Sequence, residues 1–118
     1  MALAAALAAD FYEEVAQSRV VWTCQDDRGI PVPTSATGRR AMPFWSSRER
    51  VEAVITSVTA YDGFIPVEIP WDDFAADWCP GLESDGLLAG LNWTPPDAVG
   101  VAIEPTRIVN NVGVWIDD

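Results

Sequence analysis

The clearest group of residues able to bind a charged ligand lies between positions 39 and 50. Four arginines flank a Trp-Ser-Ser sequence here, and the group comprises Arg39, Arg40, Trp45, Ser46, Ser47, Arg48 and Arg50. The first amides of a helix favour negative charge, and the serines come directly before a segment with helical spacing. This group therefore predicts a site for an anion or an acidic peptide. The alternative is that the arginines pair with the chain's own surplus of acids.

The two serines also invite comparison with a catalytic nucleophile. Ser46 with Glu49 matches the S/T-x-x-E capping box, which assigns the hydroxyl to a helix N-terminus. The chain contains no histidine, which excludes histidine-dependent triads, Cys-His dyads and imidazole metal sites. We therefore assign no catalytic residue, and the sequence favours a protein without enzymatic activity.

A second charged group is anionic and comprises Asp72, Asp73, Asp77, Glu83 and Asp85. Carboxylates are suitable ligands for Ca²⁺ or Mg²⁺, but their spacing does not match the calcium-binding loop of an EF-hand. Asp72 and Asp73 fall in the first turn of an expected helix, where negative charge is favourable, and Asp85-Gly86 is typical of a turn. We predict no metal or other cofactor here, and instead expect these acids to contact a basic protein partner.

The charge of the whole chain is distributed unevenly. Its formal net charge is -11, and residues 62–118 hold eleven acids and one arginine, whereas residues 1–61 hold seven acids and six arginines. An anionic surface speeds and orients association with a basic partner, although it also serves solubility alone. The attraction to phosphates that nucleic-acid binding requires is missing, so DNA and RNA are excluded as expected partners.

Six tryptophans are many for 118 residues. Trp22, Trp71 and Trp78 fall on the apolar faces of expected elements, which predicts packing in the core. Trp45 follows a proline by two positions, and Trp93 ends an expected strand, where an aromatic side chain can line a pocket or an interface.

The elements that position these residues follow from hydrophobic spacing and turn signals. We expect helices over residues 3–18, 47–60 and 71–79, the last one ended by Pro80-Gly81, and a short helix over 105–109. Expected strands cover residues 20–24, 41–45, 64–69, a hairpin of 87–93 with 99–103, and 112–116. Together they predict one α+β domain over residues 1–118, with a mostly antiparallel sheet of about five or six strands and helices mainly on one face.

Three sequence blocks resemble one bacterial family. They are Ala41–Ser47, Ile69–Phe74 with Trp78, and Gly81–Trp93. In this order and spacing they are similar to the family catalogued as domain of unknown function 2750, over about residues 11–112, with the tail 113–118 outside it. The resemblance implies no catalytic or ligand-binding residue, because the family is itself uncharacterised.

The remaining features bear on compartment and function. No stretch approaches the roughly 18 apolar residues of a membrane helix, and the alanine-rich start lacks a basic leader segment. We expect Cys24 and Cys79 to be two buried thiols. These features together predict a cytoplasmic protein without a membrane partner. We predict a non-enzymatic binding protein, of immunity type in one version, whose anionic C-terminal half contacts a basic protein. The alternative is a small-molecule or anion-binding module near the Trp45–Arg50 corner, with hydrolase activity as one version. The sequence does not predict the oligomeric state.

Overall fold

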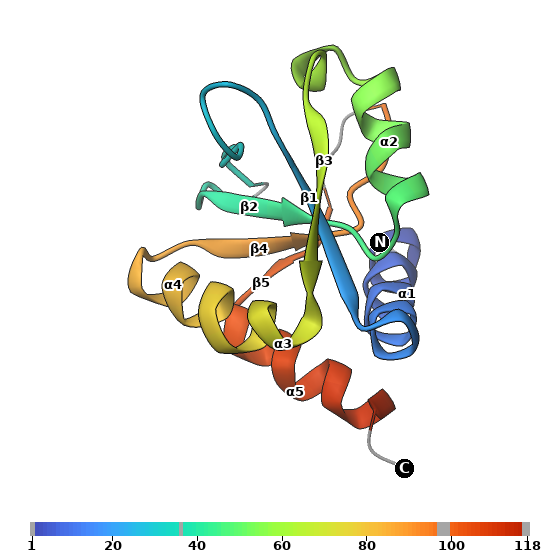
Figure 1. Cartoon of the computed structure of the whole chain (residues 1–118), viewed down its shortest axis with the longest axis vertical. Helices are drawn as coiled ribbons and strands as arrows, with labels where there is room; N and C mark the ends of the chain where they lie inside the picture. The colour runs from blue at the N-terminus through green and yellow to red at the C-terminus, as the bar shows by residue number, and fades with distance from the viewer. Residues whose placement is uncertain (1, 36, 97–99, 117–118) are drawn as a thin grey trace.

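The computed structural model describes residues 2–35, 37–96 and 100–116, and it begins with the long helix α1(Ala2–Ser18) (Figure 1). Phe11 and Val15 of this helix are fully buried, as their four-residue spacing predicts. The helix ends because Arg19 adopts a left-handed conformation, with φ 61°, and turns the chain into the first strand. The expected helix over residues 3–18 is thereby confirmed.

The first sheet consists of β1(Val20–Gln25) and β3(Ile65–Pro70), which pair antiparallel with Val20 opposite Pro70. Proline lacks the amide hydrogen that a central strand must donate. In a two-stranded sheet each strand has one unpaired edge, which is why Pro66 and Pro70 are accommodated in β3.

The second sheet has three strands in the order β2-β4-β5. Strand β2(Ala41–Phe44) runs parallel to β4(Leu88–Leu91), and β5(Ala102–Ile103) returns antiparallel to β4, which confirms the expected hairpin. Residue 99 of that hairpin lies outside the described residues. Among the described residues, one isolated β-bridge, between Trp22 and Trp45, links the two sheets. The strands therefore form two sheets and not the single sheet expected from the sequence.

The helical segment after β3 is longer than predicted. It consists of α3(Trp71–Asp73), the π-helical turn η2(Phe74–Trp78) and α4(Cys79–Ser84). The predicted end at Pro80-Gly81 is wrong because the π turn closes just before Pro80, which then lies in the first turn of α4, where a missing amide hydrogen is tolerated.

The C-terminal prediction also requires correction. Instead of a short helix and a strand over 112–116, one helix, α5(Pro105–Ile116), covers both. Ile108 and Val112 are both fully buried, and their four-residue spacing is helical. The weak alternation around Gly113 therefore reflects the outer side of a helix and not a strand.

The core lies on both faces of the three-stranded sheet. On one face, Phe44, Ala89 and Leu91 pack with residues of α1, α4 and α5. On the other, Leu88 packs with α2(Arg48–Ser57), the 3-10 turn η1(Thr59–Tyr61) and two buried tryptophans. Most helices therefore cover one face, and Figure 1 shows α3, α4 and α5 at one end of the molecule with α2 at the other.

Within the residues that the structure describes, none of the helices combines the length and the apolar character needed to cross a lipid bilayer.

Candidate functional site

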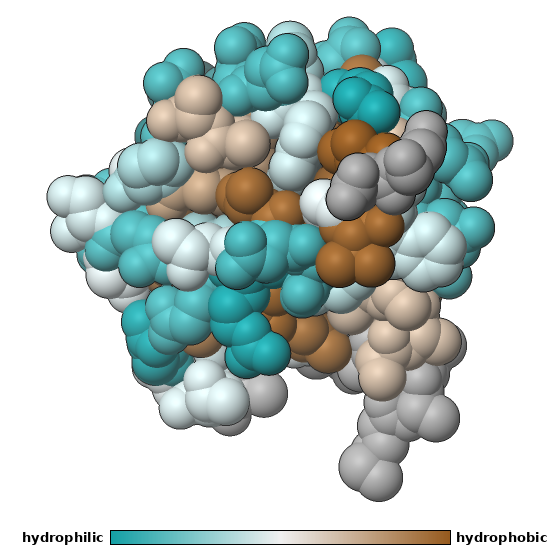
Figure 2. Space-filling model, turned by 90° about the horizontal axis from the view of Figure 1, so that it is seen from below, coloured by the Kyte–Doolittle hydropathy of each residue, from teal (hydrophilic) through white to brown (hydrophobic). Residues whose placement is uncertain are grey.

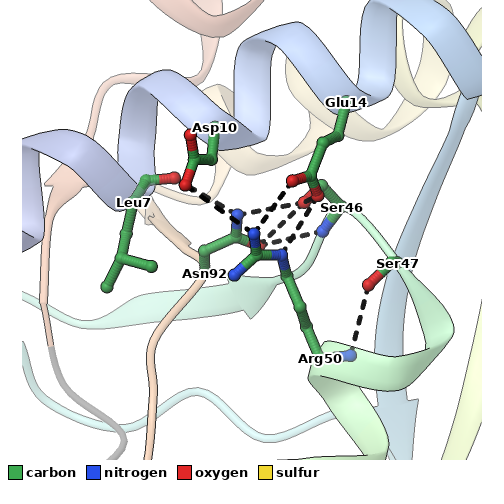
Figure 3. A network of polar contacts seen from close by, with 7 residues as sticks. All are labelled: Leu7, Asp10, Glu14, Ser46, Ser47, Arg50 and Asn92. Carbon is green, nitrogen blue, oxygen red and sulfur yellow. Dashed lines mark hydrogen bonds and ion pairs between the residues drawn. The ribbon is translucent and has the colours of Figure 1, made fainter.

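The Ser46 corner, which we define as Glu14, Ser46, Ser47, Arg50 and Asn92, lies where two parallel strands end (Figure 3). Ser46 follows β2 and Asn92 follows β4, so the parallel pairing brings them to the same edge of the sheet. The Ser46 amide donates to Asn92 Oδ1 at 2.9 Å, and the Asn92 amide donates to the Phe44 carbonyl at 2.9 Å. Asn92 adopts a left-handed backbone, with φ 51°, which points its side chain back at Ser46.

Helix α1 crosses this edge and completes the network. Ser46 Oγ donates to Glu14 Oε1 at 2.6 Å. Arg50 donates to both oxygens of the same carboxylate, from Nε at 3.1 Å and from Nη2 at 2.9 Å, and Asp10 lies 3.8 Å from Nη2. Asn92 Nδ2 donates to the Leu7 carbonyl at 3.2 Å. The corner therefore ties α1, α2 and the ends of two strands together.

The electrostatics of the corner argue against a serine nucleophile. Hydrogen bonds from Arg50, with a smaller one from Ser46, hold the pKa of Glu14 below its ordinary value against the opposing effect of burial. The hydrogen bond to Glu14 likewise raises the pKa of Arg50. A carboxylate held ionised in this way is a weak base, and Ser46 is only 3% exposed. The arrangement stabilises the fold and does not present an activated hydroxyl.

The predicted helix cap is wrong by one residue. Ser47, and not Ser46, is the N-cap of α2, and its Oγ accepts from the Arg50 amide at 3.2 Å. Ser46 is drawn inward by Asn92 and Glu14, so its side chain is not available for capping.

The structure does not gather the four arginines into one anion site. Arg39 and Arg40 precede β2, whereas Ser46 follows it, so the length of the strand separates them. Arg39 pairs with Glu104 at 2.9 Å, and Arg40 Nε donates to the Val32 carbonyl at 3.2 Å. Arg48 pairs with Glu52 at 2.8 Å, with its guanidinium 5.8 Å from the centre of the Trp22 ring. Each arginine of the predicted site therefore has a partner within the chain.

The two tryptophans expected at a pocket are enclosed. Trp45 is 0% exposed and donates from Nε1 to the Trp93 carbonyl at 2.8 Å. Trp93 is 1% exposed, and its Nε1 donates to the Val101 carbonyl at 2.9 Å. Trp93 nevertheless borders a cleft of about 430 Å³, whose lining comprises Glu14, Ser47, Glu49, Arg50, Ala53, Trp93, Thr94 and Pro95. The corner thus has an adjacent cleft, which Trp45 does not line.

The acidic face, which we define as Asp72, Asp73, Asp77, Glu83 and Asp85, lies on the outer side of the helical segment from α3 to α4 and, with Asp85, in the turn that follows it. All five residues are exposed, and for Asp72, Asp73 and Asp77 this agrees with the expected position opposite the buried Trp71 and Phe74. Glu83 accepts from the Thr106 amide at 3.3 Å, but no ion pair among the described residues engages any of the five. In the described part of the chain, no three acidic or cysteine side chains converge on a point where a metal ion would fit.

A shallow groove of about 260 Å³ opens at this face. Its lining comprises Met42, Asp77, Trp78, Gly81, Leu82 and Asp85. Figure 2, which looks at this end of the molecule, shows hydrophobic side chains reaching the surface between hydrophilic ones. Trp78 is half-buried, and its ring packs edge-to-face with Phe44 at 6.1 Å between centroids. The groove therefore combines an apolar floor with carboxylates at its rim.

The two cysteines are free and buried, as predicted, and they lie in different core clusters. Burial raises the pKa of the Cys24 thiol to about 12, with a smaller contribution from Asp26. Burial likewise raises the pKa of Cys79 to about 12, with a smaller contribution from Glu83. Both thiols stay protonated at neutral pH, so neither is a competent nucleophile.

Sequence reasoning missed Glu14 and Asn92, the two residues that organise the Ser46 corner. Glu14 lies 32 positions from Ser46, and Asn92 lies 46 positions from it. An asparagine after a strand is an indication of a left-handed backbone, which is the one local signal that the sequence offers for Asn92.

The comparison with curated proteins finds no match. The model of a family described as "Protein of unknown function (DUF2750)" matches residues 8–112, which is most of the chain and agrees with the resemblance of the sequence blocks. On this basis, the chain belongs to the DUF2750 family.

Proposed function

We propose that this chain is a non-enzymatic binding protein, cytoplasmic in location, that contacts a basic protein partner through its acidic face. Neutralisation of a basic toxin, as an immunity protein performs it, is one version of this function. Association with a basic partner uses carboxylates that are free to form intermolecular ion pairs, because such pairs set the association rate and the specificity.

One observation carries the proposal. The arginines at positions 39, 48 and 50 pair with acids of the chain itself, whereas the acidic face forms no ion pair among the described residues. Exposed carboxylates repel one another and gain little from the fold, so an opposite charge from another molecule is the interaction that they favour. The enclosed serine and the protonated thiols support a function without covalent chemistry.

The test uses two charge-matched triple variants. One carries D72N, D73N and D77N on the acidic face, and the other carries E13Q, D27N and D62N on exposed sites elsewhere. A partner captured on the wild-type chain is identified, purified and titrated against all three proteins at several salt concentrations. We expect the first variant to lose at least about tenfold in affinity and to show a weaker salt dependence, while the control stays close to wild type. Equal losses in both variants would contradict a role for the acidic face.

The cleft beside the Ser46 corner favours a second candidate function, the binding of a small molecule. Its volume of about 430 Å³ lies in the range of ligand sites. Two glutamates and one arginine line it, and the arginine is already held by Glu14, so the lining does not favour an anion. A fragment screen by NMR tests this candidate: shifts centred on Ala53 and Thr94 would support it, and no shift there would contradict it.

A further inference from the structure

The groove in the acidic face has a carboxylate at each end and a glycine between them. Asp77, Gly81 and Asp85 follow one another at four-residue intervals and all line the groove. A side chain added at Gly81 would meet open space, so the glycine leaves a gap between the two carboxylates. An α-helix of eight residues spans roughly 12 Å, and the segment from the π turn at Asp77 to the α4 cap at Asp85 has about this length.

The floor of the groove is apolar and contains an aromatic ring. Trp78 and Met42 are half-buried, and Leu82 closes the bottom. The ring of Trp78 is fixed by its edge-to-face contacts with Phe44, so it offers a stable surface for stacking. Tryptophan is the best of the aromatic side chains for binding a cation over its face. The groove holds about 260 Å³, below the usual range for a whole ligand, so it matches one side chain.

We propose that this groove is an arginine-selective docking site, in which a guanidinium of the partner stacks on Trp78 and donates hydrogen bonds to Asp77 and Asp85. The inference rests on the proposed function and specifies which residue of the basic partner enters the acidic face. Charge complementarity identifies the occupant as a cation, and the geometry selects between the two basic side chains. A guanidinium is planar and has five donors directed along its edge, so it stacks on the ring and reaches a carboxylate on each side. A lysine ammonium is a strongly hydrated point charge that satisfies one carboxylate at a time and stacks less well.

The test compares two peptides of equal charge with the full chain. Each peptide carries four basic residues separated by Gly-Ser, all arginine in one and all lysine in the other. Both are titrated at low ionic strength into ¹⁵N-labelled protein, and the indole resonance of Trp78 is followed. We expect the arginine peptide to bind at least about fivefold more tightly and to shift the Trp78 indole and the Gly81 amide most strongly.

Variants separate the groove from the general charge of the surface. The double variant D77N with D85N should abolish the preference for arginine. The control double variant E13Q with D62N removes the same charge from exposed sites elsewhere and should retain the preference for arginine. W78F keeps an aromatic ring at the floor but stacks a cation less strongly, so it should reduce the preference severalfold.

The outcomes distinguish this inference from the function on which it rests. Equal affinity for the two peptides, a preference for lysine, or shifts that avoid Trp78 would overturn the arginine site and leave binding through the acidic face intact. A preference for arginine that survives D77N with D85N would also overturn the site. Failure of both peptides to bind at low ionic strength would overturn the inference and the proposed function together.

Discussion

The Ser46 corner and the acidic face are both rich in charged and polar groups, yet the fold uses them differently. At the corner, Glu14 accepts from Arg50 and from the Ser46 hydroxyl, and Asn92 bonds to the Ser46 amide and the Leu7 carbonyl. On the acidic face, the carboxylates are exposed on the helical segment and the turn that follows it, and they form no ion pair among the described residues. Charges at the corner are therefore a part of folding, whereas those on the acidic face remain available to another molecule.

The difference follows from burial. Polar groups enclosed between a helix and the end of a sheet must be hydrogen-bonded, because leaving one unpaired costs about 1–3 kcal/mol. No such requirement applies to exposed carboxylates, whose ion pairs within the chain contribute little. Substitutions at the corner should therefore change the stability, and substitutions on the acidic face should change association.

The largest effect is expected for Asn92→Ala. The variant leaves the buried Ser46 amide without an acceptor and places alanine in a left-handed backbone, so we expect a loss of about 2–4 kcal/mol in the free energy of unfolding. Urea denaturation measures it. Asn92→Gly separates the two causes, because glycine adopts the positive φ without strain but still lacks the side chain. A loss below about 1 kcal/mol in Asn92→Ala would show that the corner does not support the fold.

A smaller effect is expected for Glu14→Gln, with a defined dependence on pH. The variant removes the charge that Arg50 pairs with, and because the pair is partly exposed we expect a loss of about 1–2 kcal/mol at neutral pH. Since Arg50 lowers the folded-state pKa of Glu14, the stabilisation is complete above the ordinary glutamate pKa of about 4.3 and is lost as the pH falls through the lowered value. Denaturation curves from pH 7 to pH 2 should converge for the two proteins at the acid end. A constant gap over that range would argue against the ion pair.

Arg39→Ala should lower the free energy of unfolding less than Asn92→Ala or Glu14→Gln, because the Arg39–Glu104 pair lies in solvent at the other end of β2. Both side chains are about half exposed, at 48% and 47%, so we expect a loss of about 0.2–1 kcal/mol that diminishes in high salt. Thermal unfolding at low and high ionic strength measures it. Arg39→Lys serves as the control. Because it keeps the charge, its stability should lie between those of the wild type and Arg39→Ala. A loss as large as that of Glu14→Gln would place Arg39 in the same class as the corner.

The spacing of apolar and acidic residues along the chain predicts those helices whose buried and exposed sides repeat at regular intervals. The four-residue spacing of Phe11 and Val15 predicted α1, and the placement of the acids opposite Trp71 and Phe74 predicted the exposed side of the helical segment. The π turn was not predictable in the same way. It lies next to Pro80, and proline usually signals the end of a helix, so the continuation to Ser84 depends on packing that the sequence does not encode locally.

The Ser46 corner depends even more on contacts between residues that are distant in the sequence. Ser46 was recognised as a polar residue near a helix start, but its role depends on Asn92, which reaches it only because β2 and β4 pair in parallel. A parallel pair has no hairpin to reveal it in the sequence. Glu14 likewise comes from a helix whose crossing over the sheet edge is a tertiary feature. The exposure of Asp72, Asp73 and Asp77 needed no such information, because it follows from the spacing within the predicted helix, whereas Glu83 and Asp85 lie beyond the predicted end of that helix.

The smallest effect on stability is expected for the triple variant D72N, D73N and D77N. Its three carboxylates have no ion-pair partner among the described residues, so the change in the free energy of unfolding should stay within about 0.5 kcal/mol. A slight loss is expected from Asp72 and Asp73 in the first turn of α3, and a slight gain from reduced repulsion. Urea denaturation beside Asn92→Ala makes the comparison direct. A loss above about 1 kcal/mol would mean that the fold depends on these carboxylates, and the contrast between the two regions would then fail.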